Sequence, residues 1–327
     1  ERHEQVTAER LSEMFCIGLE RAQATLRATN QRGTRSAVLP ISRRYRTDRR
    51  FDIKRLDGKF ATDTLWAKVI SLESNKASQI YSHKCGFKMV YHMKRANGLN
   101  VGNTLSDFIH EYGAPRHLTF DGTAVQKGNN TLFYNNLRRA DIKWHVSSPR
   151  RPKENPAEAT IQELKGKWYY MQSKHNIPSR LGDYGLTWIA ETGNVIATSS
   201  KYAKGRTPLE IVTSETLDIS EYLDFGFYDL IWFHENAGLG PRLLGRWLGV
   251  SHKVGRLMTY FVLKSNGQIL SCSSVQRVTN LELQTDENKA IFAKFDKSIN
   301  DRLKEDVKSY DGDKPNLEHW ADFADDP

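Results

Sequence analysis

Cysteine is scarce in this chain of 327 residues: Cys16, Cys85 and Cys272 stand far apart, and no C-x-x-C pair occurs. This spacing supports neither a disulfide framework nor a cysteine-rich zinc site, so we expect reduced thiols and an intracellular setting. No apolar run approaches the roughly 18 residues of a membrane span, and no secretory signal is present, so no membrane partner is expected. The chain begins at Glu1 rather than Met, as a segment cut from a longer polyprotein would.

Positive charge is in excess, because 48 Lys and Arg residues outnumber 39 Asp and Glu residues and give a net charge of +9. Such an excess favours a polyanionic partner, most often nucleic acid, although an ordinary basic protein has the same totals. The hydrophobic content of 39% is enough for a core. The length predicts two or three structural units.

The order of patterns along the chain predicts an α/β fold with additions at both ends. Three alternating strand patterns in 59–95 precede helix, strand, helix, strand and helix up to residue 165, which is typical of one mixed sheet. Short strand patterns in 224–284 predict a small antiparallel β-barrel. Residues 301–327 hold nine acidic and four basic residues, so we expect a disordered or weakly helical tail. The predicted parts are a helix-turn-helix-like segment (1–35), a basic linker (36–58), the α/β core (59–200), a helical connection (201–223), the barrel (224–284) and the acidic tail (285–327).

The first 35 residues predict two helices separated by a break at 16–18. Thr7 fits the cap of the first helix, and the predicted inner face of the second consists of Leu19, Ala22 and Leu26, with Thr25 on its polar side. A helix-turn-helix that contacts DNA has this pattern, and so has a plain helical hairpin docked on the next domain. The linker that follows can track a phosphate backbone or serve as a solvated tether. Its candidate DNA-binding residues are Arg43, Arg44, Arg46, Arg49 and Arg50.

Three carboxylates mark a candidate site in the core. Asp63 lies on the first predicted strand, Asp121 ends a central strand, and Glu158 lies in the first turn of a helix that Asn155 caps and Pro156 starts. Carboxylates that converge at one sheet edge repel unless they share hard divalent cations such as Mg²⁺. Two such ions can activate a hydroxyl and stabilise a leaving oxygen in phosphoryl transfer. Singly, each acid could instead be a turn residue or a partner of the helix dipole.

Basic residues flank this candidate site. Lys165 lies two helical turns after Glu158 on the same face, where it can contact DNA or be a plain surface lysine. His145 is either a neighbour of the site or an ordinary sheet residue. The loop before Glu158 is either a DNA contact or merely a mobile loop, and its candidate DNA-binding residues are Arg150, Arg151 and Lys153.

Residues 59–280 resemble the integrase region of copia-type LTR retrotransposons, within the DDE transposase and retroviral integrase superfamily. Three segments carry the resemblance, and Leu248-Gly249-Val250 and Val275 fall at positions typical of the family's barrel. The segments are Leu118-Thr119-Phe120-Asp121-Gly122, Asn155-Pro156-Ala157-Glu158 with Leu164-Lys165, and Gly205-Arg206-Thr207-Pro208-Leu209-Glu210 through Asp218-Ile219-Ser220-Glu221-Tyr222-Leu223.

The resemblance implies an RNase H-like core, Mg²⁺ or Mn²⁺ as two ions, DNA 3′-end processing and DNA strand transfer. Asp63, Asp121 and Glu158 would be the catalytic metal ligands. The implied partners are double-stranded DNA, as element ends and target, and further copies of the chain in a homo-oligomer. The implied location is the nucleus, after a cytoplasmic virus-like particle.

Two departures accompany the resemblance. The family's His-His-Cys-Cys zinc module is missing before the core, so no zinc site is expected. The interval between Asp121 and Glu158, 36 residues, is one longer than the commonest family spacing, whereas Glu154 would give 32 and Glu163 would give 41. A catalytically inactive DNA-binding derivative and a nuclease that cleaves without joining remain alternatives.

Overall fold

The centre of the molecule is a five-stranded mixed sheet, seen in a computed structural model that describes residues 5–31, 54–122, 131–147, 155–235, 240–252 and 258–303. The strand order is β3-β2-β1-β4-β5, with β1, β2 and β3 antiparallel and β4 and β5 parallel to β1. The predicted mixed α/β core is thereby confirmed. The strands are β1 (Arg55–Trp66), β2 (Ala77–His83), β3 (Lys88–Met93), β4 (Ala114–Asp121) and β5 (Lys143–Ser147).

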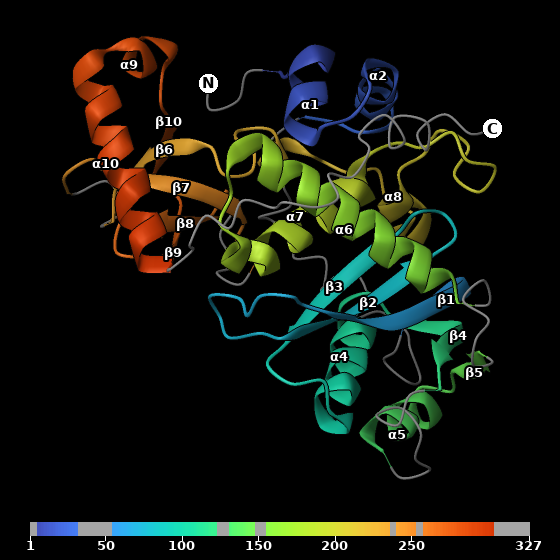
Figure 1. The fold of residues 1–327 in the computed structure, drawn as a ribbon. Coiled ribbons are helices and arrows are strands. Elements are labelled where there is room, and N and C mark those ends of the chain that lie inside the picture. Colours follow the sequence, from blue (N-terminus) through green and yellow to red (C-terminus); the bar gives the residue numbers. More distant parts are fainter. Residues whose placement is uncertain are drawn as a thin grey trace.

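Helices cover both faces of this sheet (Figure 1). Helices α4 (Gly98–Glu111) and α5 (Leu132–Arg139) lie on one face, and α6 (Pro156–His175) and α7 (Gly182–Val195) lie on the other. Successive residues of a strand point to opposite faces, so Phe60 packs in the core on the α4 side. Leu65 packs with Leu164 in the core on the α6 side.

Local sequence determines where α6 begins and how it packs. The side chain of Asn155 accepts a hydrogen bond from the Ala157 N–H at 3.1 Å, and Pro156 occupies the first turn, as the sequence predicts. Ile161, Leu164 and Trp168 are buried and follow at helical spacing.

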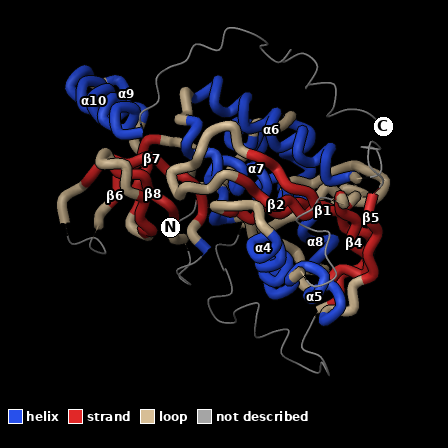
Figure 2. Tube along the Cα trace, turned by 60° about the horizontal axis from the view of Figure 1, so that its bottom comes forward, coloured by secondary structure: helices blue, strands red, loops and turns tan. Residues whose placement is uncertain are grey.

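A second, antiparallel sheet lies at the other end of the molecule, with α7 between the two sheets (Figure 2). Its strand order is β10-β6-β7-β8-β9, yet only Ser273 and Ser274 separate β9 from β10 in sequence. The end of β9 and the start of β10 must therefore lie close together, and closure of this sheet into the predicted barrel stays a prediction. The strands are β6 (Leu230–Phe233), β7 (Leu243–Val250), β8 (Tyr260–Lys264), β9 (Ile269–Cys272) and β10 (Val275–Arg277), and α8 (Pro208–Thr213) and η3 (Ser220–Tyr222) precede them.

The N-terminal helices α1 (Ala8–Phe15) and α2 (Leu19–Ala28) dock on α7 and its surroundings rather than standing apart. Phe15 meets Trp188 with ring centroids 5.9 Å apart. The predicted inner face of α2 was wrong in part, because Leu19 is 44% exposed whereas Thr25 is fully buried. Burial of Thr25 is tolerated because its hydroxyl accepts a hydrogen bond from the Ala197 N–H at 2.9 Å. Contact of these helices with DNA stays a prediction.

The predicted acidic tail from residue 285 is wrong for its first part. After α9 (Asn280–Gln284), residues Asp286–Leu303 form helix α10. This helix has one apolar stripe at helical spacing, and Arg246 on β7 forms an ion pair with its Asp296 at 2.6 Å. The buried residues of the stripe are Phe292, Phe295, Ile299 and Leu303. Residues 304–327 lie outside the described part of the chain. None of the described helices combines the length and apolarity needed to cross a bilayer.

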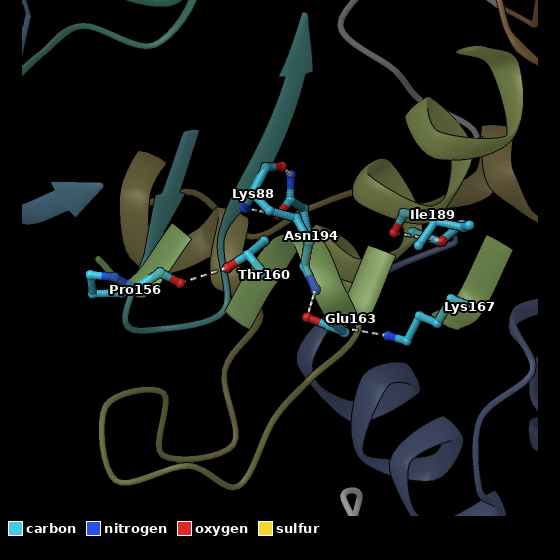
Figure 3. Close-up of polar contacts among 8 residues, drawn as sticks. Lys88, Pro156, Thr160, Glu163, Lys167, Ile189 and Asn194 are labelled. Carbon is cyan, nitrogen blue, oxygen red and sulfur yellow. Dashed lines mark hydrogen bonds and ion pairs between the residues drawn. The ribbon is translucent and has the colours of Figure 1, made fainter. Parts of the chain in front are cut away.

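Lys88 on β3 links this strand to α6 through its buried ammonium group and to α7 through its backbone (Figure 3). Lys88 Nζ donates to Glu163 Oε2 at 2.5 Å, and Glu163 Oε1 accepts from Lys167 Nζ at 2.6 Å. Asn194 on α7 exchanges two hydrogen bonds with the backbone of Lys88, of 2.8 and 2.7 Å. Burial lowers the pKa of Lys88 to about 8, although the carboxylate of Glu163 acts in the opposite direction.

Replacing Glu163 with Gln keeps the size of the side chain but removes the counter-charge of Lys88. Because a buried charge without a partner is unfavourable, we expect the free energy of unfolding in urea to fall by about 3 kcal/mol. Lys167→Met, which removes the more exposed partner, should cost no more than about 1 kcal/mol. The double variant Lys88→Met/Glu163→Leu should be more stable than Glu163→Gln, and the opposite order would contradict this account.

Candidate functional site

Strand register brings Asp63 and Asp121 to the same edge of the mixed sheet. β1 and β4 are parallel, and Thr62 pairs with Phe120, so the next residue along each strand is one of the two acids. Asp121 is the last residue of β4 and pairs with Ser147 of β5. Both carboxylates therefore lie toward the carboxyl ends of adjacent parallel strands, where open sheets commonly form ligand sites.

Asn155 brings the start of α6 to this edge. Its side-chain amide nitrogen donates to Thr62 O and to Asp63 Oδ2, both at 3.4 Å, while its amide oxygen caps the helix. Glu158 lies in the first turn that this cap begins. One residue thus fixes both the helix start and its position on β1.

The ionisation of Asp63 responds to burial, to a hydrogen bond and to three neighbouring charges. Burial raises the pKa of Asp63, and a hydrogen bond of 2.7 Å from the Thr64 N–H lowers it. The carboxylates of Asp121 and Glu158 raise it further, and the ammonium of Lys165 lowers it. The charges of Asp121, Glu158 and Lys165 therefore act on Asp63, and the assignment of these four residues to one site stays a prediction.

Two hydrogen-bond donors at this site were not recognised from the sequence. Ser147 Oγ donates to Asp121 Oδ1 at 2.6 Å, and the amide of Asn155 contacts Asp63 besides capping the helix. Ser147 follows the next predicted strand after the one that Asp121 ends. When two such strands lie parallel and side by side, the residues at their carboxyl ends are neighbours. The signal for Asn155 was its cap position, three residues before Glu158.

Across the residues that the structure describes, no group of three or more His, Cys, Asp or Glu side chains is arranged to hold a metal ion. The donor chemistry of Asp63, Asp121 and Glu158 fits a hard cation, because each supplies carboxylate oxygens. Three carboxylates that approached one another closely would repel unless they shared such a cation. Their assignment as metal ligands stays a prediction.

The other predicted residues are distributed as follows. His145 is exposed on β5, and Glu163 contacts Lys88 and Lys167. Glu154 lies outside the described residues, as do the predicted DNA-binding residues of the linker and of the loop before α6, which are Arg43, Arg44, Arg46, Arg49, Arg50, Arg150, Arg151 and Lys153.

A cleft of about 1820 Å³ lies elsewhere, between β3, α4, α7 and the second sheet, and none of the three acids lines it. Its lining includes His92 and Asp183, which join β3 to α7 at 3.4 Å. Carboxylates line the cleft too, namely those of Glu73, Glu111, Asp183, Glu191 and Glu215. We place the candidate site at the three acids rather than in the cleft, because strand register and the cap of α6 direct them from three separate segments to one edge of the mixed sheet.

No family model matches the sequence, and the comparison with curated proteins gives no match. Many solved structures are similar, among them three at 15% identity each. The first is a chain of the simian T-cell lymphotropic virus intasome in complex with PP2A regulatory subunit B56 gamma (TM-score 0.37, 68% of this chain and 81% of that chain). The second is the catalytic core domain of BIV integrase (0.36, 48% and 93%), and the third is the HTLV-2 integrase catalytic core domain in complex with magnesium, in a trimeric form (0.37, 47% and 95%). These similarities are distant.

Asp63→Asn tests the electrostatics of the site without any substrate. The pKa of Asp63 in the folded chain lies above its ordinary value of 3.8, so its contribution to stability is present below that value and is lost as pH rises through the folded pKa. Thermal unfolding in EDTA should therefore show Asp63→Asn to be more stable than the parent at about pH 7 and equal to it near pH 3.

The matched control is Asp57→Asn, which removes a largely exposed carboxylate from the same strand. It should change stability by less than about 0.5 kcal/mol at neutral pH. A loss of stability in Asp63→Asn at neutral pH would contradict the charge repulsion inferred here.

Proposed function

We propose that this chain is the integrase of a copia-type LTR retrotransposon, a polynucleotidyl transferase that processes DNA 3′ ends and joins them to target DNA. The observation that carries the proposal is the convergence of Asp63, Asp121 and Glu158 from β1, β4 and α6, with Lys165 beside them. Acids from three separate segments raise the energy of the folded chain when they meet, so a role in binding cations and substrate accounts for their placement.

The sheet supports an RNase H-like core. Three antiparallel strands are followed by two that are parallel to β1, in the order β3-β2-β1-β4-β5, and α6 with Glu158 follows the last of them. Asp63 on β1 and Asp121 on β4 lie on neighbouring strands, and Glu158 lies in the first turn of the helix whose cap, Asn155, contacts Asp63.

The three carboxylates would hold Mg²⁺ or Mn²⁺. When bound, two such ions supply charge stabilisation for the attacking and leaving oxygens of a phosphodiester. The chain itself orients the ligands, because Thr64 and Asn155 donate to Asp63 and Ser147 donates to Asp121. Lys165 is suited to bind a DNA phosphate next to the acids, which would repel the phosphate without cations.

The proposed partner is double-stranded DNA, both as element ends and as target. The basic residues of the linker and of the loop before α6 would bind its phosphates without reading sequence. Joining two ends requires more than one active site, so we propose a homo-oligomer that acts in the nucleus.

The test is a joining assay with labelled duplex ends and Mg²⁺ or Mn²⁺. The parent protein should form joined products, and Asp121→Asn should reduce joining to background while binding of the same duplex changes less than about twofold. Asp57→Asn should retain full joining, because its carboxylate lies outside the site.

The products separate the proposed function from its alternatives. Cleavage without joined products would indicate a nuclease, and DNA binding without cleavage at either metal would indicate an inactive derivative. Joining that survives Asp121→Asn would refute the assigned site.

A further inference from the structure

One face of α6 continues beyond the acids as a basic and aromatic surface. A helix turns by about 100° per residue, so residues 7 and 11 positions after Glu158 return to within about 20° of its direction. These residues are Lys165 and Tyr169, both partly exposed. Glu163 lies about 140° from Glu158 in the same geometry and is held by Lys88 and Lys167.

Lys68 meets this face from the segment that follows β1. Its Nζ lies 5.7 Å from the centroid of the Tyr169 ring, which is within the range of a cation–π contact. Lys68 follows Asp63 by five residues, or about 16 Å of extended chain, and Tyr169 follows Glu158 by about 16 Å of helix. The two segments therefore run in the same direction from the acids and meet again at the Lys68–Tyr169 pair.

We propose that Lys68 and Tyr169 bind the backbone of the DNA strand that leads away from the reacting phosphate. At about 3.4 Å per nucleotide, the contact would lie about five nucleotides from that phosphate. The ammonium of Lys68 neutralises a backbone phosphate, and the Tyr169 ring holds the ammonium in place. The phenol hydroxyl of Tyr169 donates to the same backbone. This contact rests on the proposed function and extends its substrate site to a defined length of DNA.

The experiment measures binding of hairpin-capped duplex ends with stems of about four and about twelve base pairs, in Ca²⁺ and with all variants made in the Asp121→Asn background. Lys68→Ala should weaken binding of the long stem about fivefold, and Tyr169→Ala about two- to fivefold. Neither should change binding of the short stem, which ends before the contact. In Lys68→Ala the slope of log K against log salt should fall by about 0.9 for the long stem.

A second lysine–tyrosine pair on the same helix supplies the matched control. Lys174 Nζ lies 5.8 Å from the ring of Tyr170, which points about 120° away from Glu158. Lys174→Ala and Tyr170→Ala should leave the affinity for both stems unchanged. Tyr169→Phe should retain more affinity than Tyr169→Ala, because the ring is kept.

Equal losses for short and long stems, or equal losses in Lys68→Ala and Lys174→Ala, would overturn the proposal in favour of diffuse electrostatic attraction. Because binding is measured in a variant that cannot join DNA, this result is independent of catalysis. Failure of the transferase assignment would appear instead as the absence of joined products from the parent protein with either metal.

Discussion

The placement of α6 depends on the buried ammonium of Lys88. A buried cation is tolerated only with a close counter-charge, and Glu163 supplies it at 2.5 Å. Glu158 lies five residues before Glu163 and points about 140° away from it, toward the sheet edge where β1 and β4 end. A slip of α6 by one turn would leave Lys88 unpaired. The ion pair therefore fixes the rotation and the height of the helix, and with them the position of Glu158.

The acid site has the opposite electrostatic character. Asp63 is partly buried beside two other carboxylates, and its pKa is raised as a result. Neutral donors contact two of these carboxylates. The Thr64 N–H and the Asn155 amide donate to Asp63, and the Ser147 hydroxyl donates to Asp121. Helix α6 thus carries Glu163, paired with Lys88 and Lys167, on one side and Glu158, near the other acids, on the opposite side. Such local conflict is expected where the site serves binding or catalysis rather than stability.

The sequence was informative where local chemistry decides the structure. The cap of α6 at Asn155 followed from local pattern, whereas the choice of Glu158 over Glu163 followed mainly from the spacing that the family resemblance implies; the structure adds that Glu163 is paired with Lys88. Prediction failed where distant partners decide. Thr25 is buried because the Ala197 N–H lies opposite it. Acidic composition concealed the apolar stripe of α10, and the Lys68–Tyr169 contact spans 100 intervening residues, so no local pattern could reveal it.

The parts added to the core are joined to it through α7. Trp188 contacts Phe15 of the N-terminal helices and Trp247 of the second sheet, with ring centroids 5.9 and 4.9 Å apart. Asn194, six residues later on the same helix, holds the backbone of Lys88. A continuous series of contacts therefore leads from both additions through α7 to Lys88, Glu163 and α6. Because domains that fold alone have separate cores, this shared core argues that the additions and the acid-bearing core fold as one unit.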